Sequence, residues 1–141
     1  MRRTIQLGLL SFLVPLTMLW GGVIKNSPTA YPTHEGHIKV SWQTEDETGV
    51  MRFEVWRSQI VGGVLGDFMK VGSIEQSSLR GNNSSYEFVD QSVFKTAGNV
   101  FAYKVRVVFQ SGAIFDSDIT RTSSTTSAAK RTWGSIKAMF R

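Results

Sequence analysis

The chain has 141 residues, enough for one ordinary domain, and no cysteine, which excludes disulfides, thiolate metal sites and a lipoprotein anchor. Its formal net charge of +5 comes from the two ends. Residues 1–30 hold three cations and residues 130–141 hold four, without an acid, so the other nine of the 16 cations face all 11 acids across residues 31–129. Because phosphate binding needs Lys and Arg clustered on the folded surface, we expect no nucleic-acid partner.

Residues 1–30 begin with Arg2 and Arg3 and then run without charge from Thr4 to Ile24. Two cations before an apolar run are typical of a secretory signal. Ala30 offers a small residue for cleavage, whereas an apolar run of about 20 residues also fits an uncleaved membrane anchor. We therefore expect export to the extracellular space or the cell envelope.

Apolar and polar residues then alternate in short segments separated by turn signals. These segments are "HIKVSW", "MRFEVWRS", "FMKVGSIE", "YEFVD", "VFAYKVRVVF" and "AIFDSDITR". Between them, "TEDETG" is predicted as a hairpin tip with solvated acids, and "QIVGGVLGD" as a loop. Short strands at this spacing predict an all-β domain, either a β-sandwich or a small barrel.

The alternation also predicts which side chains form the core, because successive residues of a strand point to opposite faces. The predicted core residues are Val40, Trp42, Phe53, Val55, Tyr103 and Val105. Trp56 points away from Val55 and is expected to be exposed, where an aromatic ring can contact a ligand such as a sugar.

From Ile38 to Thr122 the chain resembles a fibronectin type III domain, of the version found in secreted bacterial surface proteins, often before C-terminal sorting segments. The matching pieces are "VSWQTEDE", "FEVWRS", "FMKVGSI", "SYEFVD", "AYKVRVVFQSG" and "FDSDIT". The resemblance implies a seven-stranded, immunoglobulin-like β-sandwich over residues 31–122, with Trp42 buried between two sheets. Phe101 stands where many such domains carry the tyrosine of a tyrosine corner, so the corner is packed only, or Tyr103 substitutes.

Few residues of the sequence are candidates for metal binding or catalysis. His34 and His37 lie three apart beside a glycine, a spacing that does not suit a zinc-binding helix. Glu45, Asp46 and Glu47 lack the alternate spacing of a calcium loop. Because both histidines lie in a predicted linker, no base is placed beside a serine or threonine nucleophile. We expect no metal, no other cofactor and no enzymatic activity.

Residues 123–141 change composition, first to Ser, Thr and Ala, which is typical of a linker, and then to "KRTWGSIKAMFR". The residues of this candidate sorting or contact tail are Lys130, Arg131, Trp133, Ile136, Lys137, Met139, Phe140 and Arg141. Its apolar residues form one stripe if the segment is helical, and its cations suit an anionic membrane surface or an export machine. A disordered end, or a strap packed on the domain, is the alternative.

Three functions are compatible with these observations. The first is an exported, non-catalytic module for cell-surface adhesion, spacing or recognition of a protein or cell-surface polymer. The second is a self-associating structural subunit of an extracellular lattice or fibre. The third is an accessory carbohydrate-binding domain that uses Trp56.

Overall fold

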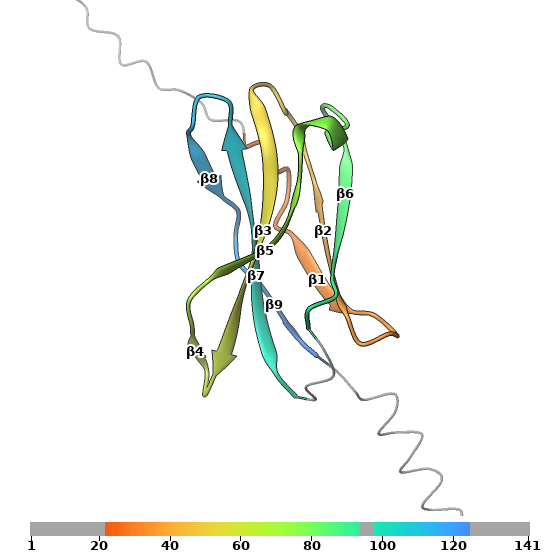
Figure 1. Cartoon of the computed structure of the whole chain (residues 1–141), viewed down its shortest axis with the longest axis vertical. Coiled ribbons are helices and arrows are strands. Elements are labelled where there is room, and N and C mark those ends of the chain that lie inside the picture. The colour runs from red at the N-terminus through yellow and green to blue at the C-terminus, as the bar shows by residue number, and fades with distance from the viewer. Residues whose placement is uncertain (1–21, 94–97, 125–141) are drawn as a thin grey trace, which may run out of the picture.

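Two antiparallel β-sheets make up the part of the chain that the structure, a computed structural model, describes: residues 22–93 and 98–124 (Figure 1). The smaller sheet contains β1 (Thr29–Pro32), β2 (Ile38–Gln43) and β6 (Ser85–Asp90), in the order β1-β2-β6. The larger sheet is built on β3 (Val50–Val61) and β7 (Val100–Phe109), with β4 (Val64–Leu65) and β5 (Met69–Ile74) paired to β3, and β8 (Ile114–Asp116) and β9 (Thr120–Ser123) paired to β7. A 3₁₀ helix, η1 (Gln76–Ser78), follows β5, and the described residues contain no helix long and apolar enough to cross a membrane. The prediction of an all-β domain is confirmed.

The described residues form nine strand segments, where the fibronectin resemblance implies seven strands. One reason is the predicted loop "QIVGGVLGD", where the structure instead continues β3 to Val61 and returns in β4. Gly62 and Gly63 have φ values of 58° and 80°, and a two-residue hairpin turn of this kind needs positive φ at both central positions. The loop prediction was wrong because the paired glycines close a hairpin.

The other reason is that the last predicted strand, "AIFDSDITR", is divided into β8 and β9, which pair with different parts of β7. Between them the Ser117 hydroxyl accepts a hydrogen bond from the backbone N–H of Val105, which interrupts the regular ladder. The chain remains in the fold through Ser124, which is buried and whose backbone N–H donates to the carbonyl of Asn99. The predicted linker from residue 123 therefore begins too early.

The sandwich also starts before the predicted boundary between residues 30 and 31. Val23 is buried in the core, and Ile24 forms a bridge with Thr44. Because β1 begins at Thr29, the predicted boundary falls inside this strand. Residues 1–21, which hold most of the predicted signal or anchor segment, lie outside the described residues.

The two ends of the described chain lie at opposite ends of the sandwich (Figure 1). Near the first end, the backbone N–H of Glu45, just after β2, donates to the carbonyl of Val23. At the other end, Ser124 is bonded to Asn99, just before β7. Between these points β1 and β9 lie beside each other, so the edge strands of the two sheets meet on one side of the sandwich.

The core lies between the two sheets and is centred on three aromatic rings. Trp42 is 3% exposed, stacks on Tyr86 at a centroid distance of 5.6 Å and meets Phe53 edge-on at 5.8 Å. The other residues predicted for the core, Val40, Val55, Tyr103 and Val105, are fully buried. Full burial of one such side chain contributes about 1.5–3 kcal/mol, so this layer supplies much of the stabilisation of the fold.

Candidate functional site

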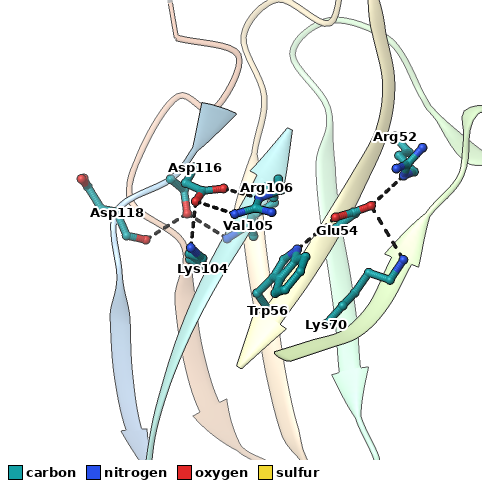
Figure 2. Close-up of polar contacts among 10 residues, drawn as sticks. Arg52, Glu54, Trp56, Lys70, Lys104, Val105, Arg106, Asp116 and Asp118 are labelled. Carbon is teal, nitrogen blue, oxygen red and sulfur yellow. Dashed lines mark hydrogen bonds and ion pairs between the residues drawn. The ribbon is translucent and has the colours of Figure 1, made fainter. Parts of the chain in front are cut away.

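Most charged side chains of the larger sheet lie on its outward side. On β3 and β7 the residues that alternate with the buried ones point away from the core, and their neighbours on β5, β8 and β9 lie in the same rows. We call this surface the outer face; it contains Arg52, Glu54, Trp56, Lys70, Lys104, Arg106, Asp116 and Arg121. Figure 2 shows that most of these side chains interact with one another across the strands.

Glu54 forms the first centre of interaction on the outer face. Its carboxylate accepts hydrogen bonds from Arg52 Nε at 2.8 Å and from Trp56 Nε1 at 3.0 Å, and Lys70 Nζ lies 3.8 Å away. Burial raises the pKa of Glu54, but the hydrogen bonds from Arg52 and Trp56 and the charge of Lys70 outweigh it, so the pKa lies below its ordinary value. Glu54 is therefore a buried anion that holds three neighbours in place.

Asp116 forms the second centre. Arg106 binds it through two hydrogen bonds, of 2.7 Å from Nε and 3.0 Å from Nη2, and Lys104 Nζ donates a third of 2.8 Å. The Arg106 hydrogen bonds and, after them, Lys104 lower the pKa of Asp116 to about 2, although burial opposes the shift. This carboxylate stays ionised over the whole physiological range.

Two cations of the outer face also lie over aromatic rings. The guanidinium of Arg106 lies 4.4 Å from the centroid of the Trp56 ring, and the ammonium of Lys104 lies 4.5 Å from that of Phe68. Trp56, expected to be exposed, is half-buried: one ring face is covered by Arg106, and its N–H is bonded to Glu54. A sugar ring therefore cannot stack on the covered face of Trp56 while Arg106 stays in place.

Glu47 does not take the solvated position expected of it in the "TEDETG" turn. It is buried, and its carboxylate accepts hydrogen bonds from Thr44 Oγ1 at 2.7 Å, Tyr86 Oη at 2.8 Å and the backbone N–H of Gly81 at 3.0 Å. It joins the turn after β2 to the loop before β6. The expectation of three solvated acids was wrong for this residue, because the turn folds back over Tyr86.

Asp90, at the other end of the core, is a second buried carboxylate that accepts several hydrogen bonds. It is 1% exposed and accepts hydrogen bonds from Arg57 Nη1 at 2.6 Å and Tyr103 Oη at 2.9 Å. Burial, and then the charge of Asp90, raise the pKa of Tyr103, so its hydroxyl remains a donor. Tyr103 thus supplies a hydroxyl anchor, to a side chain and not to the backbone, while Phe101 packs beneath Arg57 at 5.5 Å.

A second feature is a shallow, open groove of about 430 Å³ beside the smaller sheet. Short hydroxyl and amide side chains line it, among them Asn26, Ser27, Ser41 and Gln43. Ser27 Oγ at its margin donates to Asp118 at 2.8 Å and so ties the segment before β1 to the larger sheet. No group of three or more His, Asp or Glu side chains able to hold a metal occurs in residues 22–93 and 98–124.

The candidate tail, residues 130–141, lies outside the described residues, and its predicted apolar stripe stays a prediction. Sequence reasoning had singled out Trp56 but missed the ion pairs around it. The signal was present as alternation, since Arg52 and Glu54 alternate with Phe53 and Val55, and Lys104 and Arg106 alternate with Val105. Charged residues at alternate positions of neighbouring strands meet on one face of a sheet.

Comparison with protein-family models gives no match, and comparison with curated proteins gives none. Several solved structures are similar to the chain. An Fn3-like protein from Clostridium thermocellum is 18% identical, over 70% of this chain and 91% of that one, with a TM-score of 0.45. A pectate lyase from Pectobacterium carotovorum is also 18% identical, over 68% of this chain and only 26% of that one, with a TM-score of 0.44. At these TM-scores the all-β, two-sheet fold rests on the strand pairing described above.

Proposed function

We propose that the chain is an exported, non-catalytic β-sandwich module of fibronectin type III kind, which recognises a partner at a bacterial cell surface. The observation that carries the proposal is the form of the outer face. Glu54 and Asp116 are each held by cations on an open sheet surface, and such interlocked side chains suit contact with a partner rather than enclosure of a reacting bond.

The division of the chain supports the export part of the proposal. The apolar run ends at Ile24, and Val23 already packs in the core, so the run and the sandwich meet within a few residues. Fractionation of a bacterial host that expresses the full chain tests this part. We expect the protein outside the cytoplasm, and mass spectrometry should show either an intact N-terminus or cleavage before Val23; retention in the cytoplasm would contradict export.

The tail is proposed as a sorting or contact element for an anionic membrane surface or the export machinery. Its four cations and its apolar residues follow a Ser/Thr-rich segment, whereas residues 31–129 carry an excess of two acids. Truncation after Ala129 should leave the melting temperature nearly unchanged and alter the cellular fraction in which the protein is found. A large fall in melting temperature with unchanged fractionation would make the tail part of the fold.

A structural subunit of a lattice or fibre is the second candidate, and the hairpin of β3 and β4 favours it. Val61 and Val64 are 68% and 70% exposed there, and β4 is the edge of its sheet. Exposed apolar residues on an edge strand promote pairing with another chain. Light scattering should then show oligomers of the full chain that dissociate with Val64→Lys; a monomer at high concentration excludes this candidate.

A further inference from the structure

The charges of the folded domain are distributed unevenly between its surfaces. The outer face holds five cations and two acids, whereas the rest of the described chain holds four cations and nine acids. On the outward side of the smaller sheet, Lys39 is paired with Glu87 and no net charge remains. The domain, acidic as a whole, therefore presents one cationic surface.

The charged side chains of the outer face differ in accessibility: Asp116 is 33% exposed, whereas Lys104 and Arg106 are 15% and 23% exposed. The Glu54 side chain is 6% exposed, whereas that of Lys70 is 49% exposed. Arg121 is exposed in the row of Ala102, and it has no acidic partner within residues 22–93 and 98–124. A ligand that approaches the outer face therefore meets Lys70 and Arg121, and beside them Asp116.

We propose that the outer face binds an acidic polysaccharide, an extended polymer that carries carboxylates and hydroxyls; this inference rests on the proposed function as a recognition module. Lys104 and Arg106 lie two residues, about 7 Å, apart on β7, and Arg52 and Arg121 lie diagonally to them on the neighbouring strands, about 7–8 Å away. This spacing suits a chain of repeated anionic groups. Asp116, beside these cations and one-third exposed, can accept hydrogen bonds from hydroxyls.

Other polyanions fit the outer face less well. Single-stranded nucleic acid is held by bases stacked on open aromatic rings, and Arg106 covers a face of Trp56. A membrane surface calls for several apolar side chains among the cations, whereas Val61 and Val64 lie on the hairpin at the end of the sheet and the exposed Ile114 lies at the edge strand β8, opposite Val108. The basic ends of the chain itself would be repelled by this surface.

The test compares two full-length variants that lose the same charge. K70Q/R121Q removes the two most accessible cations of the outer face, and K25Q/K39Q removes two from other surfaces, while the basic ends remain in both. Binding to alginate at low ionic strength is measured by calorimetry, with neutral dextran as the uncharged polymer. Because one exposed ion pair contributes up to about 1 kcal/mol, K70Q/R121Q should weaken alginate binding by about tenfold and K25Q/K39Q by much less.

Equal losses in the two variants would reduce the effect to net charge and overturn the inference, as would absence of alginate binding by the wild type. Poly-glutamate, single-stranded DNA and phosphatidylglycerol vesicles are measured in parallel. Tighter binding of any of these, with the same dependence on Lys70 and Arg121, would replace the polysaccharide with that class of partner. Export is scored separately by fractionation, so an exported protein that does not bind alginate contradicts this inference alone.

Discussion

Asp90 is almost completely buried, yet its charge is compensated, because Arg57 and Tyr103 both donate to the same oxygen and Ser92 donates to the other. A buried carboxylate is tolerated only when it is paired and hydrogen-bonded. This one joins β3, β6 and β7, so it links the two sheets through a single side chain. Its loss would leave the Arg57 cation and the Tyr103 hydroxyl buried without their partner.

Asp90→Ala should therefore lower the free energy of unfolding by about 3–5 kcal/mol, since it leaves a buried charge uncompensated. Tyr103→Phe removes one hydrogen bond and should cost only about 1 kcal/mol. Urea denaturation of the two variants measures both values. Glu87→Ala, at an exposed carboxylate, serves as the control, and a loss at Asp90 no larger than that control would show that the cluster does not stabilise the fold.

Asp116 should make stability depend on pH below the physiological range. Its pKa of about 2 in the folded protein lies below the ordinary value of 3.8, so folding favours the ionised carboxylate. The stabilisation is complete above about pH 4 and is lost as the pH falls toward 2.

Asp116→Asn tests this dependence. The variant should be less stable than wild type at pH 7, by no more than about 1 kcal/mol because solvent screens a partly exposed pair, and the difference should vanish near pH 2. Thermal melts across this pH range measure it. A difference that stays constant down to pH 2 would mean that the ion pair contributes nothing to the acid dependence.

At this scale the sequence predicts which side chains of a strand face the core, and the six residues named for it are buried. It does not predict where the partners of a polar residue lie. Glu47 was placed in solvent, and Trp56 was treated as a free ring, because their partners come from Tyr86 and Arg106, far away in the sequence. Pair contacts of this kind depend on the tertiary arrangement.

At the scale of elements, β5 approaches β6 of the other sheet through Gly72, which lies opposite Val55 in the β3–β5 ladder. A Cβ atom at Gly72 would lie 2.2 Å from Cε2 of the Phe88 ring, far inside van der Waals contact. The absence of a side chain thus lets the Phe88 ring pack against the backbone of β5. This contact helps to close the sandwich where the two strands approach.

Gly72→Ala should destabilise the domain by about 1–3 kcal/mol, the usual range for overpacking in a core. Combining it with Phe88→Leu, which shortens the side chain in its way, should recover part of that loss. A double-mutant cycle by urea denaturation gives the coupling energy between the two positions. Additive effects would show that the ring moves aside and that the close approach has no energetic consequence.

Strand positions were largely predictable from alternation, whereas the ends and breaks of strands were not. The β3–β4 hairpin was missed because "VGGV" was interpreted as loop punctuation, although adjacent glycines also close a tight hairpin. The cationic outer face was missed for a different reason. Charge was counted along the chain, and a sheet collects charges from strands that are distant in sequence, as Arg52, Lys104 and Arg121 show.

At the scale of the whole molecule, the N-terminal part of the sandwich is the segment from residue 22 to residue 30. It contributes the buried side chain of Val23, the first half of the β1 ladder and the hydrogen bond from Ser27 to Asp118. A signal cleavage after Ala30 would remove all three. The fold is therefore compatible with cleavage before this segment, or with no cleavage.

A chain that starts at residue 22 should consequently be more stable than one that starts at residue 31. Loss of the Val23 side chain alone should cost about 1.5–2 kcal/mol of burial, and the broken β1 ladder adds to it. Comparison of the melting temperatures of the two purified chains measures the difference. Equal melting temperatures would show that the sandwich tolerates a boundary after Ala30.

The exit of the chain from opposite ends of the sandwich has a mechanical consequence. If one end is held at a cell and the other is loaded by a partner, tension runs along β1 and β9, parallel to the strands. The hydrogen bonds of β1 to β2 and of β9 to β7 then resist sliding together, instead of opening one after another. The β3–β4 hairpin and Ser124 lie at the same end of the sandwich, so pulling through these two points does not load the strands along their length. We expect the domain to resist a higher force when it is pulled through its termini. Single-molecule measurements of the unfolding force along the two directions test this expectation.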